Sequence, residues 1–119
     1  MLPTNKGAHF EKLACQYLRK QGYHEITCNY RCRFGKIDLI MGNRHQLVFV
    51  EVKYRSHGSW GDAVEAVGHH KQNRLRLAAR HFLLCHPRLQ HMQCRFDVLG
   101  ISRNSAGICL YKWIPDAFI

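Results

Sequence analysis

The sequence predicts a single mixed α/β domain over residues 1–119, with a central mixed sheet flanked by helices. Two segments with helical periodicity alternate with apolar segments of strand length, in the order helix, three strands, helix, two strands. The chain is long enough to build one hydrophobic core, and no linker, repeat or low-complexity tract divides it.

The first helix is predicted over residues 7–21. Its apolar side chains follow the spacing of one helix face: Phe10, Leu13, Ala14, Tyr17 and Leu18. Gly22 follows as a natural helix end. Glu11 lies about 100° around the helix from Phe10, at the margin of the apolar face. Its carboxylate is either solvated or reaches into an adjoining cleft.

Three strands are predicted next, over residues 23–30, 36–41 and 46–54. A basic turn from Arg31 through Arg33 to Gly35 joins the first two, and residues 42–45 form a hairpin connection between the second and third. Alternation along the second strand predicts two opposite faces: Ile37, Leu39 and Met41 on one, and Lys36, Asp38 and Ile40 on the other.

The third strand carries two charges at the end of an apolar run, Leu47-Val48-Phe49-Val50-Glu51-Val52-Lys53. An unpaired charge in a buried strand is costly, so these positions need a partner or a function. Glu51 and Lys53 emerge on the same face, about 7 Å apart along the chain. If the second and third strands are antiparallel neighbours, Asp38 and Glu51 converge on one cation.

The second helix is predicted over residues 67–86, with Pro87 as its end. Its buried face consists of Leu75, Ala78, Ala79, Phe82 and Leu83, and its polar side is rich in Lys and Arg. Two more strands follow over residues 93–101 and 107–114. Asp97 lies inside the first of them, and pairing with a nearby Arg is a better explanation for it than a catalytic role.

The chain is strongly basic, with 18 Lys and Arg against 8 Asp and Glu and a formal net charge of +10. Such an excess attracts polyanions and favours a nucleic-acid partner, although a solubilising surface, acidic lipids or another protein would also explain it. The loop after the third strand contains Arg55, His57 and Trp60. The two basic residues could meet phosphate, and Trp60 could either stack on a base or cap the core.

The six cysteines show no paired zinc-ligand spacing, and free thiols are expected. A zinc site from His24, Cys28 and Cys32 is the weaker alternative. The sequence has no apolar run of membrane-spanning length and no signal-peptide pattern at its start, so a cytoplasmic protein is expected.

Two acids about a dozen residues apart, followed by a lysine two positions later, suit phosphodiester hydrolysis. Mg²⁺ takes one or two carboxylates together with waters and substrate phosphate oxygens. It neutralises phosphate charge and activates a water, which a lysine beside it can orient. Asp38, Glu51 and Lys53 supply these groups.

The chain resembles the YraN-like family of uncharacterised bacterial proteins, similar to archaeal Holliday junction resolvases within the restriction-endonuclease-like nuclease superfamily. Asp38 and Glu51-Val52-Lys53 match the superfamily signature, Asp, then Asp or Glu, any residue, and Lys. The remaining matches run in order along nearly the whole chain: Gly7 to Glu11, Ala14, Tyr17-Leu18, Asn29-Tyr30-Arg31, Gly35 to Ile40, Val48 to Lys53, Arg55-Ser56, Lys71, Ala78 and Arg95 to Val98.

This resemblance implies a restriction-endonuclease-like αβββαβ core in which Asp38 and Glu51 bind Mg²⁺ or Mn²⁺, joined by the backbone carbonyl of Val52. It implies that Lys53 orients water or contacts phosphate, and that Glu11 also lines the metal site. Lys71 and Gln72 are further candidates on the second helix. The chain departs from the family at Lys36, where Glu is usual. The Lys36 amine would lower metal affinity if it turned inward and contact phosphate if it pointed outward.

Three functions follow as hypotheses. The first is a metal-dependent DNA endonuclease, acting on branched or damaged DNA. The second is a non-catalytic nucleic-acid-binding module that retains the nuclease fold, and the third is a protein-interaction role. Related nucleases often work as homodimers, but no interface motif decides the oligomeric state of this chain.

Overall fold

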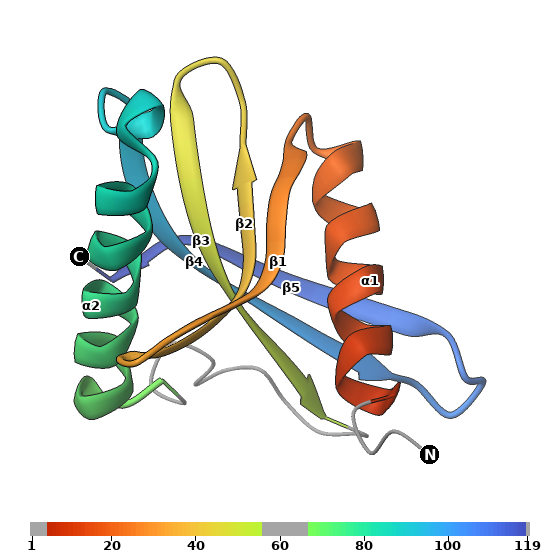
Figure 1. The fold of residues 1–119 in the computed structure, drawn as a ribbon. Helices are drawn as coiled ribbons and strands as arrows, with labels where there is room; N and C mark the ends of the chain where they lie inside the picture. Colours follow the sequence, from red (N-terminus) through yellow and green to blue (C-terminus); the bar gives the residue numbers. More distant parts are fainter. Residues whose placement is uncertain (1–4, 56–66, 119) are drawn as a thin grey trace.

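A computed structural model describes residues 5–55 and 67–118, and it confirms the predicted mixed α/β fold and its order of elements. The helices and strands are α1 Asn5–Lys20, β1 His24–Cys32, β2 Gly35–Gly42, β3 Gln46–Arg55, α2 His69–Cys85, the short 3₁₀ helix η1 Pro87–Leu89, β4 Gln93–Arg103 and β5 Cys109–Phe118. Figure 1 shows the two helices on either side of a strongly twisted sheet.

The five strands form one mixed sheet in the order β1-β2-β3-β4-β5. Strands β1 to β3 are antiparallel neighbours, β4 runs parallel to β3, and β5 returns antiparallel to β4. The parallel pair needs a crossover connection, which α2 supplies. Two helices and a five-stranded mixed sheet in this order are compatible with a nuclease-like αβββαβ core followed by one further strand.

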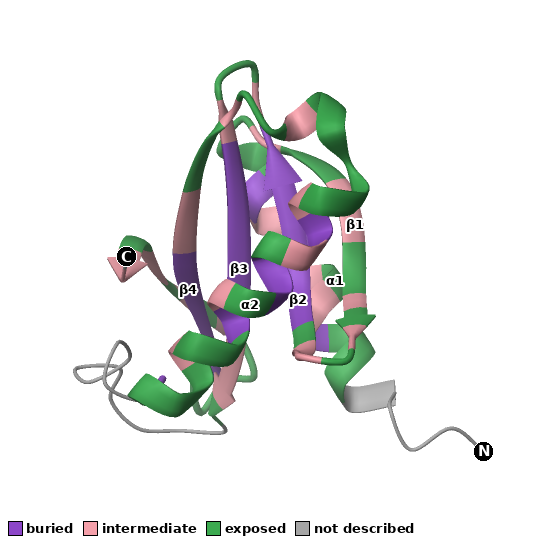
Figure 2. Cartoon of the chain, turned by 60° about the vertical axis from the view of Figure 1, so that its left-hand side comes forward, coloured by how far each residue is buried: buried purple, intermediate pink, exposed green. Residues whose placement is uncertain are grey.

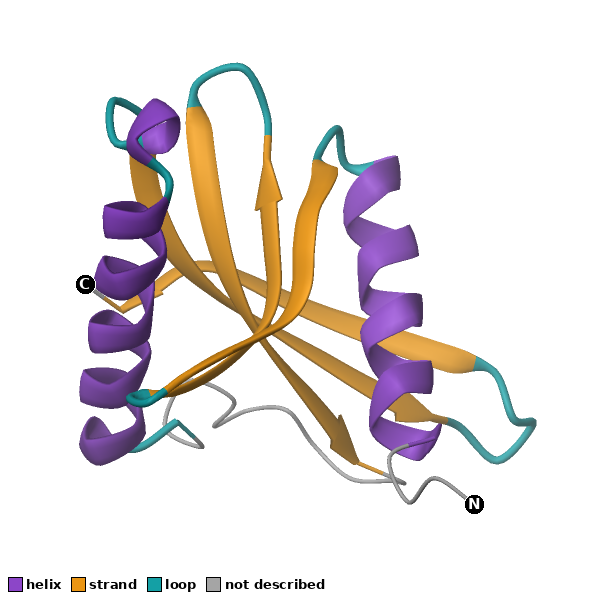
Figure 3. Ribbon diagram, viewed as in Figure 1, coloured by secondary structure: helices purple, strands orange, loops and turns teal. Residues whose placement is uncertain are grey.

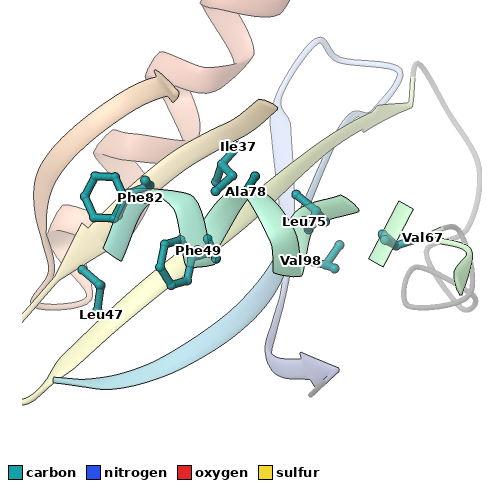
Figure 4. Close-up of a cluster of buried hydrophobic side chains, with 10 residues drawn as sticks. Ile37, Leu47, Phe49, Val67, Leu75, Ala78, Phe82 and Val98 are labelled. Atoms are coloured by element: carbon teal, nitrogen blue, oxygen red, sulfur yellow. The ribbon is translucent and has the colours of Figure 1, made fainter. Parts of the chain in front are cut away.

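Each helix covers one face of the sheet, as the view by secondary structure shows (Figure 3). The α1 face is packed by Phe10, Ala14 and Leu18 of the helix against Leu39, Met41, Val48, Val50, Leu99 and Ile101 of the sheet. The α2 face is packed by Leu75, Ala78, Ala79 and Phe82 against Ile37, Ile40, Leu47, Phe49 and Val98 (Figure 4). Strands β2 and β3 are therefore buried on both faces, and they are the purple strands in the middle of Figure 2.

The prediction for the faces of β2 was wrong at the start of the strand. Ile37 packs on the α2 face together with Ile40, whereas Leu39 and Met41 pack on the α1 face. The alternation of side chains along β2 is interrupted between Ile37 and Leu39. These two residues pair with Tyr30 and Cys28 of β1, and Asn29 between those partners has a left-handed φ of 52°. The irregular backbone lies beside Asp38, which is one of the candidate site residues.

Several strands end at other residues than predicted. Arg31 and Cys32 extend β1 and Arg31 pairs with Lys36, so the turn is shorter than predicted. The last strand continues to Phe118 instead of ending at residue 114, through Pro115 and through Asp116 with its positive φ of 53°. Pro87 does end the helical segment before it, because it begins the separate 3₁₀ helix.

Asp97 is fully buried and paired with Arg95, as expected. The guanidinium donates from Nε to Oδ1 at 2.8 Å and from Nη2 to Oδ2 at 2.9 Å. Trp113 Nε1 and the backbone N–H of Asp116 also donate to the same carboxylate. These bonds fasten β5 to β4 and raise the pKa of Arg95 through its hydrogen bond to Asp97. The network is a structural one.

All six cysteines are free thiols, and Cys15 is buried between α1 and β1. Burial, together with the hydrogen bond that its thiol donates to Glu25, raises the pKa of Cys15 to about 11. Neither helix in residues 5–55 and 67–118 is long and apolar enough to cross a membrane.

Candidate carboxylate and lysine site

The structure brings the principal site residues predicted from sequence together in one pocket of about 200 Å³. Glu11, Asp38, Glu51, Val52 and Lys53 all line it. They come from α1, β2 and β3, and Phe10, Tyr54, Lys36 and Lys71 complete the walls. We call this the carboxylate pocket.

Asp38 and Glu51 lie where β2 and β3 stop pairing. The ladder begins at Leu39↔Val50, so the next opposed positions in the same register are Asp38 and Glu51. Instead of a backbone partner, the N–H of Val52 donates to Asp38 Oδ2 at 2.8 Å. The Asp38 carboxylate therefore holds the two strands at their point of separation and leaves Oδ1 toward the pocket.

Glu51 is buried and is contacted by two ammonium groups. Lys53 Nζ lies 3.3 Å from Glu51 Oε2, as expected for neighbours on the same strand face. Lys71 from α2 contacts the same oxygen. Because Glu51 follows Phe49 on the face that α2 covers, the first turn of α2 is the element that reaches it.

Lys36 is turned inward. Its Nζ lies 3.2 Å from Asp38 Oδ1 and 3.9 Å from Glu11 Oε2. Of the two orientations considered from the sequence, the inward one therefore holds here. Lys36 joins Glu11 of α1 to Asp38 of β2. The described residues that line the pocket include three carboxylates and three ammonium groups.

The carboxylates pay a desolvation cost that the lysines only partly offset. Burial, reinforced by the charge of Asp38, raises the pKa of Glu51 despite Lys71 and Lys53. Burial and the charge of Asp38 also raise the pKa of Glu11, while Lys36 acts in the opposite direction. Burial alone would lower the pKa of Lys71, but its hydrogen bond to Glu51 raises it. The site therefore favours additional positive charge near its acids.

The donor set fits a hard cation that keeps waters and takes substrate oxygens. In residues 5–55 and 67–118 no three His, Cys, Asp or Glu side chains are placed to hold a metal ion by themselves. Mg²⁺ does not need such a cage, since one or two carboxylates suffice beside water and phosphate. Asp38 and Glu51 are adjacent in register and Val52 lines the same pocket, so these residues suit Mg²⁺ better than a structural zinc ion.

The remaining nucleic-acid candidates are placed differently. Arg31 is exposed on β1, and its charge acts to lower the pKa of Glu11. Arg33 is exposed in the β1–β2 turn, with its guanidinium over the ring of Phe34. Arg55 is exposed at the end of β3. Gln72 does not reach the carboxylates, because its side chain donates to the Val67 carbonyl and accepts from Arg76. His57 and Trp60 lie outside the described residues.

Sequence reasoning missed two features around the site. Phe10 and Tyr54 stack at 3.8 Å between ring centroids and form one wall of the carboxylate pocket. Arg74 of α2 lies beside the pocket, and its spacing of three residues from Lys71 is the signal that could have identified it. A larger cavity of about 420 Å³ lies between α1 and β1 on the other side of Glu11, but Asp38, Glu51 and Lys53 do not line it.

If Asp38 and Glu51 bind Mg²⁺ as the resemblance implies, replacing Lys36 by Met should strengthen that binding. The ammonium group occupies the side of the Asp38 carboxylate that a cation would approach, so its removal ends a direct competition. The Lys36 side chain is 48% exposed, and after solvent screening the gain is about 1 kcal/mol, roughly fivefold in affinity. Titration calorimetry with Mg²⁺ measures it, with Lys20→Met at the end of α1 as the charge-matched control. An unchanged or weaker affinity of Lys36→Met would contradict the expectation.

Residues 10–101 match the model of a family described as uncharacterised protein family UPF0102. The chain is 47% identical over 114 residues to a UPF0102 protein of Alcanivorax borkumensis, covering 96% of this chain and 91% of that one. It is 45% identical over 115 residues to a UPF0102 protein of Aeromonas hydrophila, with 96% and 85% covered. The solved structure of Pyrococcus furiosus SfsA in complex with Ca²⁺ is similar at a TM-score of 0.39 and 15% identity, over 92% of this chain and 62% of that chain, a level that supports no argument about function.

Proposed function

This chain belongs to the uncharacterised protein family UPF0102, and we propose that it is a Mg²⁺-dependent nuclease that hydrolyses phosphodiester bonds in DNA. One observation carries the proposal. Glu11, Asp38, Glu51 and Lys53, from three separate elements, line one small pocket at the point where two central strands separate. The net charge of +10 supports a polyanionic substrate. A cytoplasmic location and branched or damaged DNA as the substrate belong to the same proposal.

The residues divide the chemistry between them. Asp38 and Glu51, with the carbonyl of Val52, would hold Mg²⁺, which supplies charge neutralisation at the phosphate and lowers the pKa of a bound water. Lys53 lies 3.3 Å from Glu51, where its ammonium group can orient the attacking water or contact a phosphate oxygen. Glu11 faces the same space from α1 and can accept a hydrogen bond from that water. Mn²⁺ suits the same oxygen donors.

A second candidate is a non-catalytic nucleic-acid-binding module. The observation that favours it is the balance of charge in the pocket. Lys36 already pairs with Glu11 and Asp38, and Lys53 and Lys71 pair with Glu51. Such a protein would bind DNA with a strong salt dependence and without need of a divalent ion.

The test uses the full chain with branched and linear DNA, each with Mg²⁺ and with EDTA. Cleavage that requires Mg²⁺ supports the nuclease. Salt-sensitive binding of the same DNA without cleavage, together with no Mg²⁺ binding in the millimolar range by calorimetry, would favour the binding module. Cleavage that continues in EDTA would overturn the assigned metal chemistry.

A further inference from the structure

A second pocket adjoins the carboxylate pocket and shares two of its lysines. It has a volume of about 280 Å³ and is lined by Gly35, Lys36, His70, Lys71, Arg74 and Leu75. It lies between the β1–β2 turn and the first turns of α2. None of the described residues that line it is acidic, and we call it the basic pocket.

Arg74 is held in place by the backbone opposite it. Its Nε donates to the Phe34 carbonyl at 3.1 Å, which fixes the guanidinium against the β1–β2 turn. A Cβ at Gly35 would lie 3.6 Å from Nε and 3.7 Å from Nη2 of Arg74. Because Gly35, at φ 141°, has no Cβ, the guanidinium packs directly against its backbone. Within residues 5–55 and 67–118, neither Arg74 nor His70 is paired with a carboxylate. The N–H groups at the end of the Arg74 side chain remain available to an anion.

The start of α2 adds to this positive potential. Gly68 is the N-cap residue and has no side chain that could cap the first turn, and that turn contains no acidic residue. Uncapped N–H groups and the helix dipole favour an anion at this end of a 17-residue helix. His70 and Lys71 belong to the same turn, so backbone and side chains act in the same direction.

We propose that the basic pocket binds the phosphate group of the nucleotide next to the one that is cleaved. The proposal rests on the proposed function for what lies in the carboxylate pocket. A DNA strand carries one phosphate per nucleotide, so a strand with one phosphate at Asp38 and Glu51 presents the next one to an adjoining site. Lys36 and Lys71 line both pockets and can contact both groups.

The chemistry of the lining matches this ligand. Four cationic or titratable donors face a group with several acceptor oxygens, and Arg supplies the planar pair of N–H donors that phosphate takes in two parallel bonds. Leu75 is apolar and buried, and it provides a surface for the sugar beside the phosphate. One water takes about 30 Å³ in the liquid. The volume of the basic pocket, about 280 Å³, is several times larger and has room for a phosphate group together with part of that sugar.

The proposal is tested with inorganic phosphate as the probe and the full chain in EDTA. Amide chemical shifts followed by NMR should change at Gly35, His70, Lys71 and Arg74 and should saturate. Arg74→Ala should weaken phosphate binding about tenfold, since it removes charge-assisted hydrogen bonds. Arg80→Ala removes the same charge from an exposed position on the same helix and should change the affinity less than twofold. Arg74→Lys should restore part of the loss.

Two results would overturn the basic pocket: shifts spread evenly over the basic surface, or equal losses for Arg74→Ala and Arg80→Ala in variants whose amide spectra show an intact fold. Neither readout depends on cleavage. Site-specific phosphate binding by a chain that cuts no DNA would support the proposed phosphate site in the basic pocket and reject the proposed nuclease activity. Mg²⁺-dependent cleavage without selective phosphate binding would do the opposite.

Discussion

Glu51→Gln should greatly slow the proposed Mg²⁺-dependent DNA cleavage while leaving the chain folded. The substitution keeps the size of the side chain and removes the charge that would hold the cation beside Asp38. Losing about 4 kcal/mol of transition-state stabilisation corresponds to a rate lower by roughly 10³-fold. The measurement is the initial rate of cleavage at saturating Mg²⁺, together with the Mg²⁺ affinity by calorimetry.

Folding of this variant is expected to be unimpaired. Burial raises the pKa of Glu51, so the ionised carboxylate is costly where it lies, and the neutral amide avoids that cost. Lys71 loses a partner but has a side chain that is 46% exposed, so its ammonium group can turn to water. Thermal unfolding by circular dichroism checks this point.

Glu25→Gln is the matched control. Glu25 lies on β1, pairs with Arg19 and accepts a hydrogen bond from Cys15, and it does not line the carboxylate pocket. The same chemical change there should leave the cleavage rate unaltered. If Glu51→Gln is folded and the Glu25→Gln control is active, cleavage by Glu51→Gln at the wild-type rate would reject the assigned site.

The order of elements and the convergence of Asp38 and Glu51 followed from sequence because both depend on short-range rules. Helical spacing and the alternation of side chains along a strand need no knowledge of the rest of the fold. Glu51 and Lys53 share a face for this reason, and their contact at 3.3 Å agrees with it. The antiparallel pairing of β2 with β3 then places Asp38 and Glu51 one position beyond the last pair, Leu39↔Val50.

The features that sequence reasoning missed depend on backbone irregularity and on tertiary contact. The left-handed Asn29 interrupts alternation beside Asp38. Asparagine adopts a positive φ more readily than most residues, but its presence in a strand does not by itself predict one. The sequence left both orientations of Lys36 open, because the carboxylates of Glu11 and Asp38 that hold it inward meet only in the folded chain. Arg74 joins the β1–β2 turn through a hydrogen bond that spans 40 residues of sequence. Apart from the three-residue spacing of Lys71 and Arg74, which places them on the same side of α2, local patterns contain no information about such contacts.

Asp97→Ala should be the most destabilising substitution among the polar residues described. The carboxylate is fully buried and accepts hydrogen bonds from Arg95, Trp113 and the backbone of Asp116. Its removal leaves the Arg95 guanidinium, whose side chain is 15% exposed, without its counter-charge. Breaking a buried pair on one side costs about 3–5 kcal/mol, which for a chain of this size lowers Tm by roughly 12–20 °C.

Denaturant unfolding of Asp97→Ala measures the loss, and Arg19→Ala provides the contrast. Arg19 also pairs with a carboxylate, that of Glu25 at 3.3 Å, but its side chain is 59% exposed. An exposed pair contributes about 0–1 kcal/mol, so the two variants separate burial from the mere presence of an ion pair. A loss below about 1 kcal/mol for Asp97→Ala would mean that β5 does not depend on this network. Because Asp97 does not line the carboxylate pocket, the Mg²⁺ binding proposed for that pocket should persist in the folded fraction of Asp97→Ala. This result would distinguish the structural role of Asp97 from the roles proposed for Glu11, Asp38 and Glu51.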